Sequence, residues 1–356
     1  MNVRERLFGS SNSEASTLSE LQLSIDRSNL VDIENEFLDE IEAFDTQSNE
    51  RSLGIDTGFP KLNEALNGLE AGLIMVSGPA NTGKTAFCLQ LAWQIANLNR
   101  DSTPEHPFRV YVLYFSLDDA TRDVIPRFVA IEEHMDIRIV KTPHRHAHSI
   151  SDLIRRATGI RKLKQSLNVI KVVDKGKGCS IEYITGEVER HMFDLQNMES
   201  RDNVRYKLVV FIDNFHDIEV ESQRYNDENR RYNDICAALD TLAIRFDLPI
   251  ICTAELRKLN GLRRPTNDDI RETVKMSYKA KAILSCYNEV GIRDQNASIY
   301  WTHPERQEKM PVLEVRFTKN KMSSYKGRLF FKFIPEQSRL IEADTMEAQR
   351  YAQASQ

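Results

Sequence analysis

The chain has 356 residues and a net charge of −5, and 41% of its residues are hydrophobic. This length suits one large domain or two small ones with a substantial core. No apolar run approaches the ~20 residues that span a bilayer, and the N-terminus lacks the apolar segment of a secretion signal, so no membrane association is expected. The five cysteines are scattered without metal-type pairing, which predicts reduced thiols in a cytoplasmic protein.

The charge is unevenly distributed along the chain. Residues 1–50 contain twelve acidic residues and three arginines, a balance of −9, so the remainder carries about +4. Residues 1–16 are polar and predict a disordered tail. Residues 17–50 predict an acidic linker or docking helix whose apolar stripe packs on the body of the chain or on a neighbouring subunit. The stripe consists of Leu30, Ile33, Phe37 and Ile41.

From residue 54 onward, apolar runs alternate with helical patterns. Most early runs are continuous, as in strands covered by helices on both faces, and this predicts an α/β fold with a mostly parallel sheet. The last two runs alternate more and predict an antiparallel edge. Residues 343–356 predict a polar, frayed tail. The expected strands are Leu73–Ser77, Val110–Leu117, Val169–Val173, Leu208–Asp213, Pro249–Thr253, Ala282–Cys286, Val312–Phe317 and Leu329–Ile334.

The segment GPANTGKT matches the phosphate-binding pattern G-x-x-x-x-G-K-[ST]. Its glycines let consecutive N–H groups turn toward phosphate oxygens, Lys84 brings a cation to the β- and γ-phosphates, and the hydroxyl of Thr85 ligates magnesium. An apolar strand precedes the loop and a helix follows it. This context favours a phosphate loop over the alternative, an incidental glycine-rich turn. The expected nucleotide-binding residues are Gly78, Pro79, Ala80, Asn81, Thr82, Gly83, Lys84 and Thr85.

A second magnesium partner is expected at the end of another strand. Five apolar residues in KLVVFIDN lead into Asp213, which places its carboxylate at the carboxyl edge of the sheet beside the loop. We expect Asp213 to hold the metal directly or through a water molecule. The alternative is that Asp213 only forms the turn after the strand.

Several segments, taken in chain order, resemble the RecA-type ATPase domain of DnaB-family replicative helicases. They are GIDTGFPKLNEALNGLEAGLIMVSGPANTGKTAF, VLYFSLDDA, LVVFIDNFHDIE, DLPIICTAELRK, RRPTNDDIRET and FTKNKMSSYKGRLFFKF. Their order and spacing are kept from residue 54 to about 342. The resemblance implies a RecA-like P-loop NTPase domain over residues 51–342 that uses ATP and Mg²⁺. It also implies a ring of identical subunits, usually six, with nucleotide sites between neighbours.

The resemblance carries over catalytic roles. Asp118 matches the family's Glu in FSLEMS, which orients the attacking water, but its side chain is one methylene shorter. Asp119 could take that part instead, and both aspartates could alternatively cap the helix that begins near Ala120. Glu255 matches the Gln in NVPVVALSQLNR that senses the γ-phosphate, although an ionised Glu would repel a phosphate where Gln donates to it.

The resemblance also predicts residues that act on other molecules. Lys319 and Lys321 match the basic finger KQR that reaches a neighbour's site, and their alternative is a solvated edge strand. The stretch IRETVKMSYKAKA matches a loop that contacts single-stranded DNA in the ring's channel. Its expected nucleic-acid contacts are Arg271, Glu272, Lys275 and Lys279, with the lysines adding salt-sensitive attraction to phosphates.

Three functions remain open from the sequence. One is an ATP-hydrolysing ring helicase or translocase on single-stranded DNA, with replication or mobile-element proteins as partners. The second is a KaiC-like ATPase that assembles with ATP and regulates a partner. The third is a scaffold that binds ATP but hardly hydrolyses it. The changes at Asp118, Glu255 and Lys321 favour the second, whereas the channel lysines favour the first. The histidines in HRHAH, residues 144–148, predict a surface loop rather than a metal site.

Overall fold

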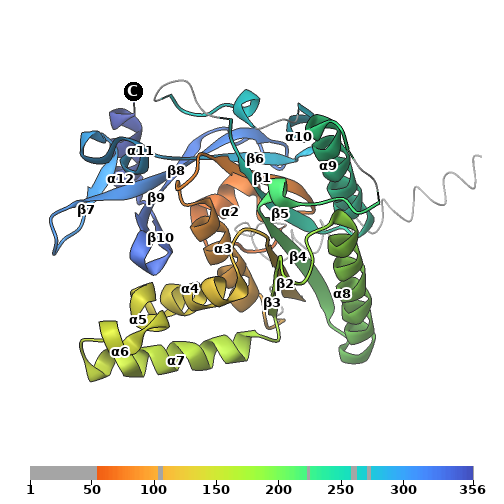
Figure 1. The fold of residues 1–356 in the computed structure, drawn as a ribbon, viewed down its shortest axis with the longest axis horizontal. Helices are drawn as coiled ribbons and strands as arrows, with labels where there is room; N and C mark the ends of the chain where they lie inside the picture. The colour runs from red at the N-terminus through yellow and green to blue at the C-terminus, as the bar shows by residue number, and fades with distance from the viewer. Residues whose placement is uncertain (1–53, 103–106, 223–224, 258–262, 271–273, 356) are drawn as a thin grey trace, which may run out of the picture. The chain divides into compact units, whose positions relative to one another are not determined.

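A central sheet with helices on both faces organises the chain from residue 54 onward (Figure 1). The computed structural model describes residues 54–102, 107–222, 225–257, 263–270 and 274–355. The tail predicted for residues 1–16 and the acidic helix predicted for residues 17–50 lie outside these residues. No described helix is long and apolar enough to cross a membrane.

The described strands form one sheet in the order β10-β9-β8-β6-β1-β5-β4-β2-β3, with β7 paired to β8. Neighbours from β6 to β3 run parallel, whereas β8, β9 and β10 run antiparallel. The predicted parallel sheet with an antiparallel edge is therefore confirmed. The strands are β1 Gly72–Gly78, β2 Phe108–Ser116, β3 Ile170–Asp174, β4 Arg205–Asp213, β5 Pro249–Glu255, β6 Ala282–Asn288, β7 Tyr300–Thr302, β8 Lys309–Asn320, β9 Arg328–Ile334 and β10 Arg339–Glu342.

The central strands are buried on both faces, which explains their continuous apolar runs. In β1, Ile74 and Val76 belong to one core, whereas Leu73 and Met75 belong to the core on the opposite face. Side chains alternate between the faces of a strand, so both faces need apolar residues when helices cover both. The strand is buried at every position.

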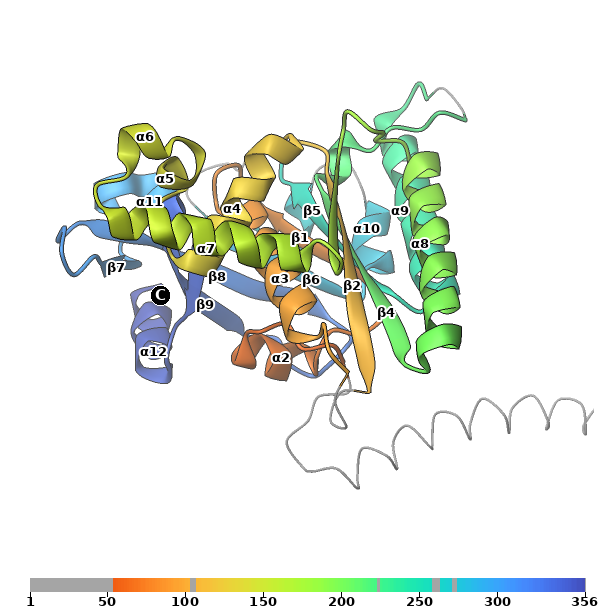
Figure 2. The ribbon, with the colours of Figure 1, turned by 90° about the horizontal axis from the view of Figure 1, so that it is seen from below.

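Helices α2, α3, α4 and α7 contribute to the first core, and α8, α9 and α10 contribute to the second (Figure 2). Helix α9 buries Ile235, Leu239 and Leu242 in the second core. The helices are α2 Pro60–Leu66, α3 Lys84–Leu98, α4 Thr121–Glu133, α5 Ile137–Lys141, α6 Pro143–His146, α7 Ile150–Ser166, α8 Ile181–Asp202, α9 Glu228–Arg245, α10 Val274–Lys279, α11 Glu289–Arg293 and α12 Thr345–Ala354.

The C-terminal segment differs from the expected frayed tail. Asp344 caps α12 in a reciprocal capping box with Glu347. Tyr351 is 1% exposed and packs against Phe330, with ring centroids 5.7 Å apart. The sequence prediction for this segment was wrong because one buried aromatic ring, in an otherwise polar stretch, anchors the helix to β9.

Candidate nucleotide site

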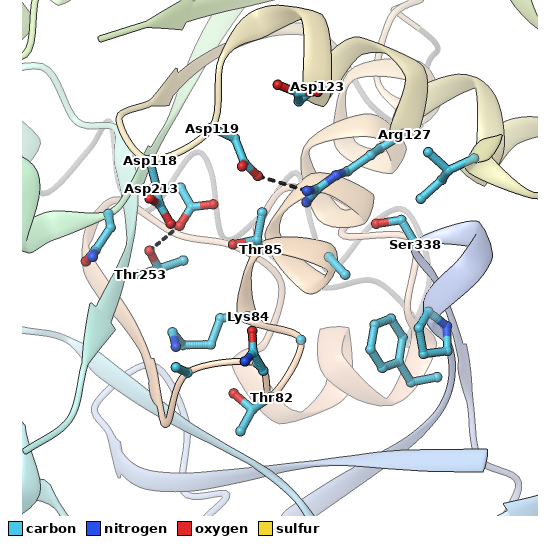
Figure 3. A pocket seen from close by; sticks show the side chains of 18 of the residues that line it. Thr82, Lys84, Thr85, Asp118, Asp119, Asp123, Arg127, Asp213, Thr253 and Ser338 are labelled. Carbon is cyan, nitrogen blue, oxygen red and sulfur yellow. Dashed lines mark hydrogen bonds and ion pairs between the residues drawn. The ribbon is translucent and has the colours of Figure 1, made fainter. Parts of the chain in front are cut away.

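A pocket of about 670 Å³ lies at the carboxyl edge of the parallel strands. The register places Gly78 opposite Glu255 and Ser116 opposite Asp213, so the ends of β1, β5, β2 and β4 meet there. The phosphate-loop motif forms one wall, and α4 and α5 form another (Figure 3). Ligands of open parallel sheets bind at this edge because the loops after the strands converge there.

The motif has the backbone that a phosphate loop needs. Asn81 has a φ of 59° and Gly83 a φ of 104°, both in the left-handed region. A Cβ on Gly83 would lie 3.2 Å from the ring of Phe333, and one on Gly78 would lie 2.8 Å from the carbonyl oxygen of Cys286. Both glycines are therefore required by conformation or space, and the predicted strand–loop–helix context is present. The pocket is lined by Ala80, Asn81, Thr82, Gly83, Lys84 and Thr85, whereas Gly78 and Pro79 of the same motif do not line it.

Lys84 lies over the loop from the first turn of α3. Its Nζ donates to the carbonyl oxygens of Gly78 and Pro79, each at 2.9 Å. Burial lowers the pKa of this ammonium, and the charges of nearby acidic groups, Asp213 and Glu255 among them, oppose the shift. An anion in the pocket would therefore meet a cation that is already held within the loop.

Asp213 lies at the end of β4 and is 5% exposed. Thr253 donates to its Oδ1 at 2.5 Å, and the hydroxyl of Tyr114 donates to its Oδ2 at 3.1 Å. Burial raises the pKa of the Asp213 carboxyl, and hydrogen bonds from Thr253, Thr85 and Tyr114 oppose this increase. Since Thr85 and Asp213 offer hard oxygen atoms side by side, the donor set fits Mg²⁺. Thr85 and Asp213 therefore lie close together, as the sequence predicted.

Asp118 and Asp119 follow β2 and line the pocket. Figure 3 shows Asp118 beside Asp213, and Asp119 in an ion pair of 2.9 Å with Arg127 of α4. Neither aspartate caps α4: the N-cap residue is Ala120, and the N–H of Thr121 donates to Asp174 of β3 at 2.9 Å. The capping alternative is therefore wrong.

Glu255 also lies on the pocket wall, at the end of β5. Its backbone N–H donates to Nδ1 of His216 at 3.2 Å. Burial raises the pKa of the neighbouring Asp217 carboxyl, and the charges of Asp118, Glu255 and Asp213 add to the increase. The metal side of the pocket is thus strongly acidic, which favours a cation accompanying any phosphate.

Lys319 and Lys321 lie away from this pocket. The end of β8 pairs with the beginning of β6, Asn320 with Ala282, at the opposite edge of the sheet from the phosphate loop. Nζ of Lys319 donates to the carbonyl oxygens at the end of α10, Ser277 at 2.6 Å and Tyr278 at 2.8 Å. Lys321 is exposed. Within one chain, therefore, neither lysine reaches the site.

The predicted nucleic-acid loop is described in part. Arg271 and Glu272 lie outside the described residues. Lys275 and Lys279 are exposed on α10, and Nζ of Lys279 forms an ion pair of 2.7 Å with Asp240 of α9. These lysines are distant in sequence from the phosphate loop, and none lines the pocket.

The sequence analysis missed several pocket residues. Lys141 of α5 forms an ion pair with Asp123 of α4, and both line the pocket. Phe333 of β9 reaches it too, as do Pro335 and Ser338 of the connection between β9 and β10. No motif signalled them, because they join the loop through folding across 250 residues. Among the described residues, no group of three or more His, Cys, Asp or Glu side chains could hold a metal. His144 and His146 belong to the short helix α6 rather than to the expected surface loop.

Comparison with known proteins places most of the chain in a family of helicase domains. A family model described as DnaB-like helicase C terminal domain matches residues 54–339. The chain is 23% identical over 272 residues to a probable replicative DNA helicase of Trieres chinensis, which covers 75% of this chain and 53% of that protein. It is 24% identical over 248 residues to the replicative DNA helicase DnaB of Rickettsia prowazekii (strain Madrid E), covering 68% and 48%. The chain thus spans about half the length of these curated relatives.

Solved structures share the fold. An ATPase domain aligns with a TM-score of 0.71 at 19% identity, covering 87% of this chain and 98% of that one. A DnaB-like replicative helicase, studied with its interactions with primase, aligns with a TM-score of 0.70 at 18% identity, covering 93% and 77%. These likenesses show a RecA-like α/β fold. Because the family model matches most of its length, the chain belongs to the DnaB-like helicase C-terminal domain family.

Proposed function

We propose that the protein is an ATP-hydrolysing ring translocase that acts on single-stranded DNA in the cytoplasm. The observation that carries the proposal is the single pocket in which the phosphate loop, the buried Asp213 and the exposed Asp118 face one another. Family membership supports ATP as the nucleotide. The names of the relatives support DNA replication as the process in which the protein acts. Because the chain matches only about half of their length, the functions of their other half are not part of this proposal.

In the proposed mechanism, the N–H groups of the loop and the N-terminus of α3 bind the phosphates. Lys84 exchanges its two carbonyl contacts for β- and γ-phosphate oxygens. Mg²⁺ would neutralise phosphate charge, and Thr85 and Asp213 are the residues that would hold it. Asp118 orients a water molecule for attack on the γ-phosphate, because it lies beside Asp213 and, among the described residues, has no ion-pair partner such as Arg127 provides to Asp119.

The lysines at the end of β8 support a site completed by a second subunit. They lie at the edge of the sheet opposite the chain's own pocket, so only a neighbour in a ring could present them to the γ-phosphate. Lys321 is the better candidate, since Lys319 is already bonded to α10. We propose a homo-oligomeric ring, hexameric as in the family, in which the segment around Arg271, Glu272, Lys275 and Lys279 faces the DNA. Replication or mobile-element proteins are the expected partners.

A second candidate is an ATP-driven assembly switch that does not unwind DNA. Two observations favour it: a carboxylate, Glu255, stands on the pocket wall, and the ammonium of Lys279 is neutralised by Asp240. Each of these features would weaken the coupling between ATP hydrolysis and the binding of a nucleic-acid strand.

The test is ATP hydrolysis by the full chain with and without a single-stranded oligonucleotide, at low and moderate salt. A translocase is expected to show at least ~10-fold stimulation that declines as salt rises, because phosphate contacts release counterions. Hydrolysis that ignores DNA supports the switch instead. Lys84→Ala should abolish turnover in either case. Light scattering should show a ring with ATP, and a monomer under every condition contradicts the shared site.

A further inference from the structure

The carboxylate of Asp213 is held by hydroxyl groups from three different elements. Thr253 of β5 donates to Oδ1 at 2.5 Å, and Tyr114 of β2 donates to Oδ2 at 3.1 Å. The third hydroxyl is that of Thr85 at the start of α3. A carboxylate offers about four lone-pair directions, so these donors leave little freedom for it to rotate.

The sheet itself produces this arrangement. Strand β4 lies between β2 and β5, so Asp213 has a neighbouring strand on each side. Ser116 of β2 pairs with Asp213, and Tyr114, two residues earlier, points to the same face. Cys252 of β5 pairs with Ile212, which brings the next residue, Thr253, alongside Asp213.

Packing of the core does not require the hydroxyl groups of Tyr114 and Thr253. Tyr114 is fully buried in the first core, where phenylalanine would fill nearly the same volume without a polar atom to satisfy. Thr253 is also buried, although valine has nearly the same volume without a polar atom. Burying these two hydroxyl groups costs free energy, and their hydrogen bonds to Asp213 offset that cost.

We propose that Tyr114 is a positioning residue that, together with Thr253, fixes the carboxylate of Asp213 toward the magnesium of bound nucleotide. The inference rests on the proposed function, because it assumes that the pocket takes a nucleotide with Mg²⁺. Residues that orient a metal ligand typically change metal affinity 10- to 100-fold when their hydrogen bond is removed. Tyr114 acts through Asp213 and touches neither nucleotide nor metal.

The test compares Tyr114→Phe with the unaltered full chain in binding N-methylanthraniloyl-ADP, measured by fluorescence with Mg²⁺ and with EDTA. The ratio of the two affinities is the gain due to magnesium. We expect this gain to fall about 10-fold in Tyr114→Phe, with affinity in EDTA within about 2-fold of the unaltered chain. Thr253→Val should lower the gain in the same way. Tyr111→Phe is the matched control, because Tyr111 lies on the same strand and faces the opposite side of the sheet.

The outcomes separate this inference from its premise. If Tyr114→Phe lowers affinity equally in Mg²⁺ and EDTA, its role is structural and the inference is overturned. An unchanged magnesium gain overturns it as well. If the unaltered chain shows no magnesium gain, the proposed function itself fails, and the inference fails with it. A fall confined to the Mg²⁺ condition, with an unchanged melting temperature in EDTA, supports it.

Discussion

The guanidinium of Arg127 lies 2.9 Å from the carboxylate of Asp119, and this ion pair separates the roles of two adjacent aspartates. Asp119 is neutralised and held by α4. Asp118 is exposed and lies beside Asp213 instead (Figure 3). The sequence left both residues open as the group that orients water, whereas the ion pair favours Asp118.

We therefore expect Asp118→Asn to lower the ATPase rate by at least about 100-fold while nucleotide affinity stays within a few-fold. Asp119→Asn, the matched control on the adjacent residue, should lower the rate by less than about 10-fold, because its charge is already paired. Steady-state hydrolysis and fluorescent nucleotide binding measure the two effects. A larger loss in Asp119→Asn would assign the water to Asp119.

Replacing Glu255 by glutamine should strengthen ATP binding. The carboxylate of Glu255 shares the pocket with Asp118 and Asp213, where it would repel the γ-phosphate of bound ATP, whereas an amide could donate to that phosphate. We expect ATP affinity to rise about 10-fold, equivalent to about 1.4 kcal/mol, with a smaller change for ADP. Titration of both nucleotides tests this. Glu305→Gln, on an exposed residue, should change neither, and an equal gain for ADP would argue against a contact with the γ-phosphate.

Mixing two inactive variants can test whether Lys321 acts on a neighbour. Lys84→Ala and Lys321→Ala should each lower turnover by at least about 100-fold as pure proteins. In rings assembled from equal amounts, about a quarter of head-to-tail interfaces would join an intact loop to an intact Lys321. ATPase activity should therefore return in the mixture. If Lys321 served its own chain, no interface would be intact and activity would stay absent.

Acid should remove the contribution of the Arg263–Asp269 ion pair to stability. Arg263 and Thr266 hold the pKa of the Asp269 carboxyl at about 2, below its ordinary 3.8. A lowered carboxyl pKa stabilises the fold above pH 4, and this stabilisation is lost as pH falls from about 4 to 2. Urea unfolding of Arg263→Gln should thus show a lower midpoint at pH 7 that converges with the unaltered chain in acid. Arg161→Gln, on exposed α7, should show no such pH-dependent difference.

Truncating the aromatic anchor of α12 should destabilise the antiparallel edge. Tyr351 is 1% exposed and packs on Phe330 of β9. Tyr351→Ala should lower the free energy of unfolding by about 3 kcal/mol, because it leaves a cavity between helix and sheet. Met346→Ala, whose side chain is 81% exposed on the same helix, should change it by less than about 0.5 kcal/mol. Equal effects would mean that α12 adds little to the fold.

Sequence patterns predicted the parts of this fold that are local. The eight expected strands are present, since each has a continuous or alternating apolar pattern, and the phosphate loop has a fixed spacing. Strands β7 and β10 were missed because three or four residues carry no readable period. The roles of Tyr114 and Thr253 were hidden for another reason: both look like ordinary strand residues until the order β5-β4-β2 places them beside Asp213.

Trp301 has a position that makes it useful as an optical probe. Its indole N–H donates to the carbonyl oxygens of Pro311 and of Phe333, whose ring approaches the phosphate loop at Gly83. The chain's other tryptophan, Trp93, is stacked on Phe128 between α3 and α4. Phe333 also lines the pocket, so we expect the emission of Trp301 to shift when a nucleotide binds, and an unlabelled chain could then report the filling of its own pocket.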